Sequence, residues 1–283
     1  MEEQSGGRMA ARAEAEEKKK KKGIGTWIYR IVILILLGVM AFSAYNLWLI
    51  YQKYHEGTVL YDDFADEFGA GKNQGTDNSR LHLDWPALQE KYPEVKAWIR
   101  SRGTKINYPI VQGTDNSYYL THAPTKEYTE KGSIFIDYEV ANPFEDFNTI
   151  IYGHRMKDGS MFFSLTNYFG EEGIDFYAEH PTMELYTPDH DYDIEIFACA
   201  TVHENDVEAY RADFHFVGED LEDENLKAEY IAKILGMNEL QAKTDVVVLP
   251  NDKIVMLSTC TALGSSRDPH REVVWGKLVP PKD

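Results

Sequence analysis

The sequence predicts a mainly β domain preceded by one membrane-spanning helix. Seven apolar segments rich in β-branched and aromatic residues occur between residues 106 and 279, and Gly, Pro, Asn or Asp bounds them. Three segments have helical patterns instead, and an uncharged stretch lies near the N-terminus. Many strands with few peripheral helices favour a closed β-barrel or a sandwich over a doubly wound α/β sheet.

The uncharged stretch, residues 31–50, has the length and composition of a transmembrane helix. Its twenty residues, at ~1.5 Å of rise each, span about 30 Å, the thickness of a bilayer's hydrocarbon core. Because no clean A-x-A site follows, an uncleaved signal-anchor in the lipid bilayer is favoured over a cleaved signal peptide. Aromatic residues suited to the membrane interface lie near its ends: Trp27, Tyr29, Trp48 and Tyr51.

The charge is distributed unevenly along the chain. Residues 1–30 carry eight basic residues against five glutamates, a net charge of +3, whereas the whole chain has a net charge of −18. The positive-inside rule therefore predicts a cytoplasmic basic tail at residues 1–30 and an extracellular location for everything after residue 51. The acidic remainder argues against nucleic-acid binding, which needs a basic face.

The composition also limits the cofactors. Two cysteines cannot form a disulfide-rich scaffold or a four-cysteine zinc site. The sequence has no HExxH motif and no paired His/Cys spacing, so no metal or other cofactor is expected. Carboxylates in residues 218–225 offer oxygen ligands to calcium, but a solvated acidic loop is the favoured interpretation.

The segment after the membrane helix, residues 51–80, is expected to be an extracytoplasmic stalk and linker. Residues 52–68 have the pattern of a short helix, and the glycine-rich polar residues 69–80 indicate a flexible linker. The folded domain is therefore expected to extend from residue 81 to residue 283.

Strand patterns follow one another through this domain. The sequence DYDIEIFA alternates polar and apolar residues, as expected of a half-buried strand. The predicted strands are residues 106–112, 132–138, 148–153, 183–187, 191–202, 252–260 and 272–279.

Three helices are predicted in this domain in addition to the strands. Asp84 is placed to cap a short helix through WPALQEKY, with Pro86 in its first turn. Residues 159–169 suit a packed helix, and residues 223–240 have an amphipathic stripe at spacings of four, four and three. The stripe consists of Leu226, Tyr230, Ile234 and Met237.

Cys260 is the candidate nucleophile. It ends the apolar segment KIVMLSTC, and polar residues follow, so it would lie at the mouth of a loop where a substrate can reach it. Cys199 lies inside IEIFACATV, where a free cysteine usually behaves as a small buried hydrophobe. A Cys199–Cys260 disulfide is the remaining alternative outside the cell.

His154 and Arg271 are the candidate partners of this thiol, because the thiolate that attacks needs a base or a cation nearby. Of the nine histidines, His154 follows an apolar strand, in NTIIYGH, and would emerge at a strand end as Cys260 does. Arg271 starts REVVWGKLV, which would pair with the Cys260 strand if the intervening loop forms a hairpin. Its guanidinium could stabilise an oxyanion or hold a substrate; Arg267 is the rival.

These motifs resemble a known family. LSTC followed by REVVWGKL, together with IIYGHRMKDGSMF, is similar to the sortases, specifically class B. The upstream stretches KINYPIVQGTDNSYYLTH and GSIFIDY match that class too. The resemblance covers roughly residues 81–283 in one order and without large gaps.

The resemblance implies a fold and a reaction. The fold would be a sortase-type closed β-barrel of about eight strands with peripheral helices. In the reaction, Cys260 would attack a threonine carbonyl in the C-terminal sorting signal of a surface protein and form a thioacyl-enzyme. An amine of the peptidoglycan cross-bridge or stem peptide, or a pilin lysine, would then resolve it. His154 would act as general acid and base, and Arg271 would hold the substrate and stabilise the oxyanion.

Four further residues match positions that line the peptide groove of class B sortases. They are Asn116, Leu120, Tyr152 and Ser258. Ordinary packing is the alternative role for each of them.

Two other functions compete with transpeptidation. A surface cysteine peptidase or amidase would use the same cysteine and histidine but pass the acyl group to water. A non-enzymatic pilin or adhesin on a membrane stalk would need neither residue.

Overall fold

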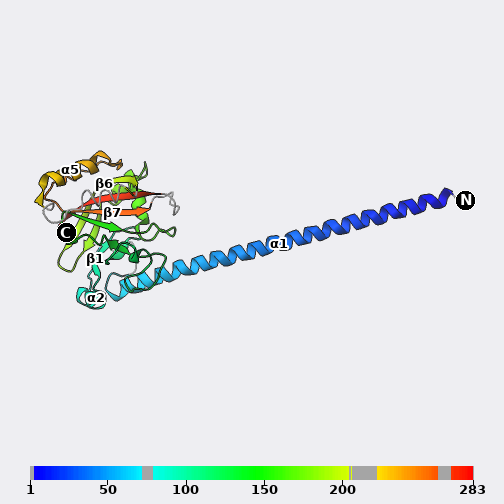
Figure 1. The fold of residues 1–283 in the computed structure, drawn as a ribbon, viewed down its shortest axis with the longest axis horizontal. Coiled ribbons are helices and arrows are strands. Elements are labelled where there is room, and N and C mark those ends of the chain that lie inside the picture. Colours follow the sequence, from blue (N-terminus) through cyan, green and yellow to red (C-terminus); the bar gives the residue numbers. More distant parts are fainter. Residues whose placement is uncertain (1–2, 72–78, 204, 206–221, 261–268, 283) are drawn as a thin grey trace. The chain divides into compact units, whose positions relative to one another are not determined.

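The structure, a computed structural model, describes residues 3–71, 79–203, 205, 222–260 and 269–282 (Figure 1). The chain forms two compact units, residues 1–53 and residues 54–283. Helix α1 (Glu3–Glu67) begins in the first unit and ends in the second. The β-strands all belong to the second unit.

One helical segment of the described chain is long and apolar enough to cross a membrane. It lies in α1, between Trp27 and Glu67 and near the N-terminus. Large apolar side chains from Trp27 to Tyr51 are exposed. Length and composition are what identify this segment as a candidate membrane span.

Eight strands close into a barrel in the order β1-β2-β3-β4-β7-β8-β6-β5, which confirms the predicted fold class and selects the barrel over the sandwich. Two neighbouring pairs, β2–β3 and β4–β7, are parallel, and the other pairs are antiparallel. The strands are β1 (Val95–Arg100), β2 (Asn107–Gln112), β3 (Ile134–Ile136), β4 (Asn148–Tyr152), β5 (Thr182–Tyr186), β6 (Asp191–His203), β7 (Ile254–Cys260) and β8 (His270–Val279).

Strand β1 is absent from the strands that the sequence predicted. Its sequence, VKAWIR, does not alternate, because five of its six residues are buried. Trp98 packs outside the barrel and Ile99 packs inside it, so both faces are apolar. Strands β2 and β4 are equally buried but were predicted from their β-branched and aromatic residues. Strand β1 also contains Lys96 and Ala97, residue types that are depleted in strands, so its composition does not indicate a strand.

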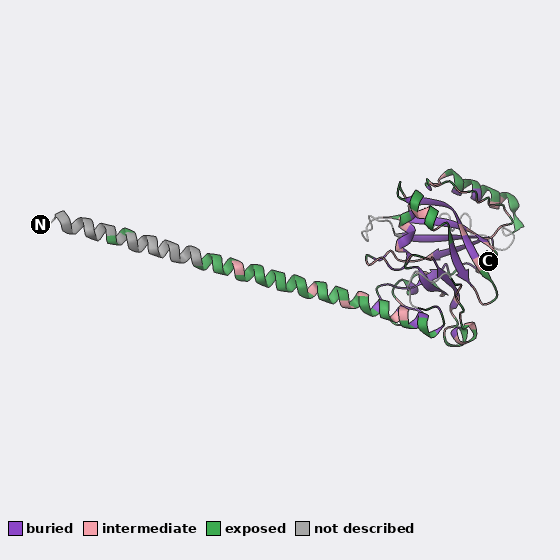
Figure 2. Ribbon diagram, turned by 180° about the vertical axis from the view of Figure 1, so that it is seen from behind, coloured by how far each residue is buried: buried purple, intermediate pink, exposed green. Residues whose placement is uncertain are grey.

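Three apolar clusters hold the barrel. One fills the interior, with alternate residues such as Ile134, Val255 and Val274. The other two cover the outer face, one beneath α5 (Glu224–Gly236) and one beneath α2 (Trp85–Lys91) and the end of α1. Figure 1 and Figure 2 show α5 and α2 on opposite sides of the barrel, with the strands buried between them.

The predicted helices form with shifted limits. The Asp84 Oδ1 atom accepts a hydrogen bond from the Ala87 backbone N–H at 3.1 Å, so Asp84 caps α2 as expected. Asp223 caps α5 in the same way, and Tyr230 and Ile234 are buried on its inner face. The segment expected as a helix at residues 159–169 is instead a 3-10 helix, η2 (Phe162–Tyr168). Helices η1 (Tyr118–Leu120) and α3 (Gly173–Glu179) were not predicted.

The end of α1 is part of the barrel domain. Tyr61, Phe64, Ala65 and Phe68 are each at most 6% exposed. Their spacing of three, one and three puts them on one helical face. On this face, the Phe64 ring stacks on Trp98 and the Tyr61 ring packs edge-on against Tyr108. The compact unit therefore begins at Tyr54, upstream of the expected start near residue 81.

A buried lysine joins this helix to the loop that follows β4. The Lys131 side chain is 3% exposed, and its Nζ donates to Asp158 Oδ2 at 2.6 Å, Ser160 Oγ at 2.9 Å and Thr58 Oγ1 at 2.9 Å. Gly57 permits the close approach, since a Cβ there would lie 3.0 Å from Thr129 Oγ1. Partial burial raises the pKa of Asp158, but the hydrogen bonds from Lys131 and Ser160 outweigh it and hold this pKa below its ordinary value.

We expect Lys131→Met to lower the free energy of unfolding by about 2 kcal/mol at pH 7, because it leaves a partly buried carboxylate without its cation. The pKa of Asp158 is depressed in the folded state, so this contribution is complete above about pH 5 and fades as pH falls below about 4. Chemical denaturation at pH 7 and pH 3 measures both effects.

The matched control is Lys253→Met, which removes a more exposed ion pair with Glu145. This variant should lose less than about 1 kcal/mol. Equal losses in the two variants would contradict the structural importance of Lys131.

Candidate functional site

The parallel pairing of β4 with β7 brings the predicted histidine and cysteine to one edge of the barrel. Tyr152 is paired with Ser258, and the Gly153 N–H donates to the Ser258 carbonyl at 3.1 Å. His154 follows Tyr152 by two residues, and Cys260 follows Ser258 by two residues. The two backbone positions therefore lie at the same level of neighbouring chain segments.

Strand β8 brings the predicted arginine to the same edge. In the antiparallel pairing of β7 with β8, Cys260 is directly opposite Arg271. The Arg271 guanidinium donates to the His270 carbonyl at 3.0 Å and is partly exposed. Arg267, the rival candidate, lies outside the described residues. Register alone thus brings Cys260 and Arg271 together across one strand pair.

His154 is held by the backbone of η1. Its Nε2 lies 2.7 Å from the Leu120 carbonyl oxygen. A carbonyl oxygen only accepts hydrogen bonds, so Nε2 must carry a proton in this contact. The His154 carbonyl in turn accepts from the Phe162 N–H at 2.9 Å, at the start of η2. Nδ1 is consequently the ring nitrogen at which His154 can gain or lose a proton.

The predicted groove residues occupy two different environments. Leu120 is 39% exposed, whereas Ser258 is 3% exposed and packs beneath the edge. Asn116 Nδ2 and the Tyr152 hydroxyl both donate to Asp137 Oδ2, at 3.0 and 2.9 Å. The structure therefore links two of the four residues through one carboxylate.

Asp137 is the residue of this region that the sequence analysis missed. It directly follows β3 and is 0% exposed. The feature of the sequence that could have identified it is an acidic residue directly after the apolar segment GSIFI. A buried carboxylate needs several hydrogen-bond donors, and a charged residue in such a position indicates that donors converge on it.

Cys199 is a free, buried cysteine, so the alternative of a Cys199–Cys260 disulfide is wrong. It belongs to the interior cluster, and its thiol contacts the Tyr168 carbonyl oxygen at 3.8 Å. Burial is the main cause that raises the pKa of Cys199 to about 12, and the nearby Glu239 and Glu272 raise it further. This thiol is therefore protonated and inert at neutral pH.

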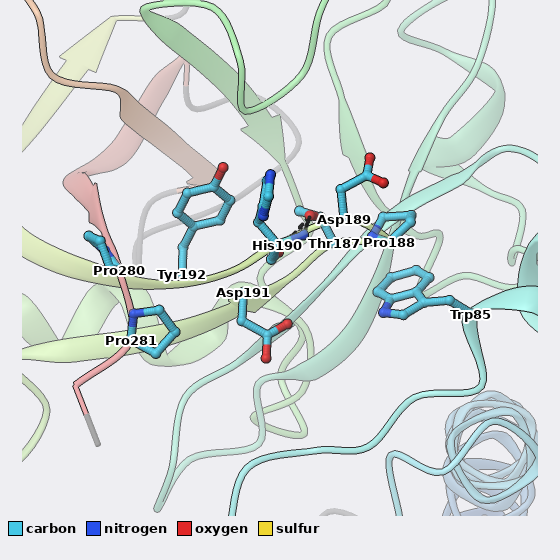
Figure 3. Close-up of a pocket in the computed structure, with 9 residues that line it drawn as sticks. All are labelled: Trp85, Thr187, Pro188, Asp189, His190, Asp191, Tyr192, Pro280 and Pro281. Carbon is cyan, nitrogen blue, oxygen red and sulfur yellow. Dashed lines mark hydrogen bonds between the residues drawn. The ribbon is translucent and has the colours of Figure 1, made fainter.

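A pocket of about 660 Å³ lies far from this edge, against the turn between β5 and β6. β6 runs for 13 residues, about 40 Å, from Asp191 in this pocket to His203 beside His270. Figure 3 shows Trp85 and Pro188 on one side of the pocket and Tyr192, Pro280 and Pro281 on the other. None of the predicted catalytic or groove residues lines it.

The described residues contain no group of three or more His, Cys, Asp or Glu side chains arranged to hold a metal ion. Residues 218–221 of the acidic loop considered for calcium lie outside the described part of the chain.

Comparisons with known proteins identify the family. The Sortase domain matches residues 99–279, more than half of the chain. Sortase B of Listeria monocytogenes is 33% identical over 257 residues, which cover 90% of this chain and 98% of that protein. Sortase B of Staphylococcus aureus is 24% identical over 249 residues, covering 88% of this chain and 96% of that protein.

Solved structures agree with this comparison. Sortase B from B. anthracis in complex with AAEK1 has a TM-score of 0.63 and 33% identity, covering 82% of this chain and all of that chain. A Staphylococcus aureus sortase B–substrate complex has a TM-score of 0.59 and 27% identity, covering 70% and 85% of the two chains.

The chain belongs to the sortase family, whose barrel its eight strands form. Its relatives and its structural neighbours place it in class B of that family, as the motifs had indicated. It is therefore a sortase transpeptidase, and the alternative of a non-enzymatic pilin or adhesin is set aside.

The burial of Cys199 predicts which cysteine a thiol reagent can reach in the folded chain. In the native chain at pH 8, a thiol reagent such as DTNB should label one cysteine, Cys260, and in denaturant it should label two. With a pKa of about 12, only about one Cys199 side chain in ten thousand is a thiolate at that pH. Counting released thionitrobenzoate measures the labelling.

Two single variants make this assignment specific. Native Cys199→Ala should still release one equivalent, and native Cys260→Ala should release none. Rapid labelling of Cys199 in the native Cys260→Ala chain would contradict the burial of its thiol.

Proposed function

We propose that the chain is a membrane-anchored class B sortase that uses Cys260, His154 and Arg271. It cleaves the C-terminal sorting signal of surface proteins and transfers the new acyl group to an amine of peptidoglycan or to a pilin lysine. The observation that carries the proposal is the register of β4, β7 and β8, which brings these three residues to one barrel edge.

In the first step, the Cys260 thiolate attacks the scissile carbonyl of the sorting signal. The carbon–sulfur bond forms, the carbonyl π electrons move to oxygen, and the intermediate then expels the amine of the leaving peptide. His154 gives this amine its proton. Nδ1 is the atom for that transfer, because Nε2 remains bonded to the Leu120 carbonyl.

In the second step, the acceptor amine attacks the thioacyl carbonyl. His154, now neutral, takes the proton from the incoming nitrogen, and the cysteine leaves as thiolate. Arg271 supports both steps, since a guanidinium always carries its charge and can donate two hydrogen bonds to an oxyanion. Its pairing opposite Cys260 supports this role.

The sorting peptide would lie along the edge formed by η1 and the end of β4. Asn116 and Tyr152 offer polar groups to its backbone, and exposed Leu120 offers an apolar contact. Buried Ser258 would form the floor. An extended peptide presents an N–H and a C=O at every residue, which suits such mixed partners.

Residues 31–50 would anchor the enzyme in the cell membrane as a single pass. The apolar segment of α1 supports this anchor. The basic residues of the tail, residues 1–30, support a cytoplasmic N-terminus and an extracellular catalytic domain at residues 81–283. Because the compact unit starts at Tyr54, the proposed domain includes the end of α1 as well, and the proposed linker shrinks accordingly.

A fluorogenic sorting peptide with and without an amine acceptor tests the reaction. Wild-type chain should form a thioacyl adduct, detected by intact mass, and the amine should enter the product. Cys260→Ala should form no adduct. His154→Ala and Arg271→Lys should each lower kcat/KM at least about a hundredfold, the scale of losing proton transfer or an oxyanion donor.

The comparison between acceptors separates transpeptidation from peptidase or amidase activity. Fast hydrolysis with no amine in the product, at any amine concentration, would assign the chain to the hydrolytic alternative. Full activity of Cys260→Ala would contradict the proposed nucleophile.

Truncation and labelling test the anchor. The full chain should fractionate with membranes, whereas a chain that starts at Tyr54 should remain soluble and keep its activity on a short peptide. A membrane-impermeant biotin reagent should label lysines after residue 51 on intact cells but not Lys18–Lys22. A full chain that is found in the soluble fraction would contradict the anchor.

A further inference from the structure

A buried carboxylate lies behind the proposed peptide groove. Asp137 follows β3, is 0% exposed, and accepts hydrogen bonds on both oxygens. Oδ1 accepts from the Glu139 N–H at 3.0 Å, and Oδ2 accepts from Asn116 and Tyr152. Its backbone carbonyl also accepts from Gln112 Nε2 at 3.1 Å. The carboxylate is therefore held in one orientation by a donor from its own loop, one from the chain before η1 and one from the end of β4.

This arrangement determines what Tyr152 can offer a substrate. A phenolic hydroxyl has one hydrogen to donate, and Tyr152 donates it to Asp137 Oδ2 at 2.9 Å. The phenol oxygen is left with acceptor capacity alone. Toward a peptide, Tyr152 therefore acts as an acceptor for a backbone N–H or a side-chain hydroxyl, and it cannot donate to a carbonyl.

The same carboxylate determines the orientation of the Asn116 amide. Nδ2 donates to Asp137 at 3.0 Å, and Oδ1 accepts from the Tyr138 N–H at 3.1 Å. Reversing the amide would set two donors against each other on one side and two acceptors on the other. The second N–H of Asn116 and the second lone pair of its oxygen keep their directions, which suit one carbonyl and one N–H of an extended peptide.

We propose that Asp137 is a positioning residue that sets the hydrogen-bonding polarity of the peptide groove. It makes Tyr152 an acceptor and fixes the donor and acceptor ends of Asn116, so the groove accepts an extended peptide backbone in one register. This inference rests on the proposed function, because it assumes that Asn116 and Tyr152 face the sorting signal. Asp137 itself does not touch the substrate.

The location of the cluster supports a role in binding rather than in proton transfer. Asn116 lies just before η1, and Tyr152 ends β4, two residues before His154. The proton-bearing contact of His154 is a separate one, with the Leu120 carbonyl. Loss of the Asp137 carboxylate should therefore weaken peptide binding more than it slows the chemistry.

Asp137→Asn tests this role in the full chain, purified in detergent. An asparagine side chain has almost the same shape, but its NH₂ group must face at least one of the three N–H or O–H donors. We expect kcat/KM for the sorting peptide to fall about tenfold, the scale of losing one hydrogen bond to a charged group. Most of the loss should lie in KM.

Two measurements separate positioning from general damage to the fold. The rate at which iodoacetamide alkylates Cys260, followed by mass spectrometry across pH, should match that of the wild type. In a double-mutant cycle, Asp137→Asn should cost clearly less in the Tyr152→Phe background, because the hydroxyl through which it acts is already missing. Damage to the fold that does not act through the Tyr152 hydroxyl would give additive losses in kcat/KM.

The matched control is Asp193→Asn at the other end of the barrel. Asp193 is 8% exposed and accepts from Arg80 at 2.8 Å and from the Lys282 N–H at 2.9 Å. Its replacement removes a comparable buried carboxylate and should leave KM unchanged, even if thermal stability falls.

The outcomes for Asp137 and for the proposed function are distinct. If Asp137→Asn keeps the wild-type KM, or if its losses and those of Tyr152→Phe are additive, the positioning role is overturned while the wild-type thioacyl adduct still stands. If the wild type forms no thioacyl adduct on Cys260, the proposed function fails instead.

Discussion

The parallel pairing of β4 with β7 is the constraint on which the rest of the site depends. Parallel neighbours end at the same edge of a sheet, so the segment after β4 and the last residue of β7 emerge together. About a hundred residues separate the two strands, and that connection carries η2, α3, β5, β6 and α5. The antiparallel return of β8 then sets Arg271 against Cys260. A slip of one residue in either pairing would turn these side chains to the opposite face.

Polar contacts outside the barrel hold the loops around this edge. Lys131 ties the end of α1 to the loop after His154 through Thr58 and Asp158. Asp137 ties the chain before η1 to the end of β4. Both groups are buried, and a buried charge is tolerated only where several partners satisfy it. Because losing one of these buried contacts would leave a charge without its partners, the contacts favour one arrangement of the surrounding loops.

Local pattern was sufficient for the strands rich in β-branched and aromatic residues, including fully buried ones such as β2 and β4, and for the capped helices. It failed at β1, where Lys96 and Ala97 weaken the strand composition, and at residues 159–169, where a helical composition folds as a 3-10 helix. It also placed the start of the domain near residue 81, because the apolar face of Tyr61, Phe64, Ala65 and Phe68 looks like any helical stalk until a surface covers it. Asp137 was missed because a single acidic residue after a strand does not reveal which donors converge on it.

The sequence by itself determined the chemistry that is available: one uncharged stretch of membrane length, a cysteine and a histidine that each follow an apolar strand, and an arginine at the start of the last strand. Its motifs LSTC, REVVWGKL and IIYGHRMKDGSMF also indicated the family. Tertiary structure decided which of these groups meet, which cysteine is inert, and which carboxylate orients Asn116 and Tyr152. The reason is physical. Periodicity and composition act over a few residues, whereas strand register, burial and shared hydrogen bonds join residues that lie far apart in the chain.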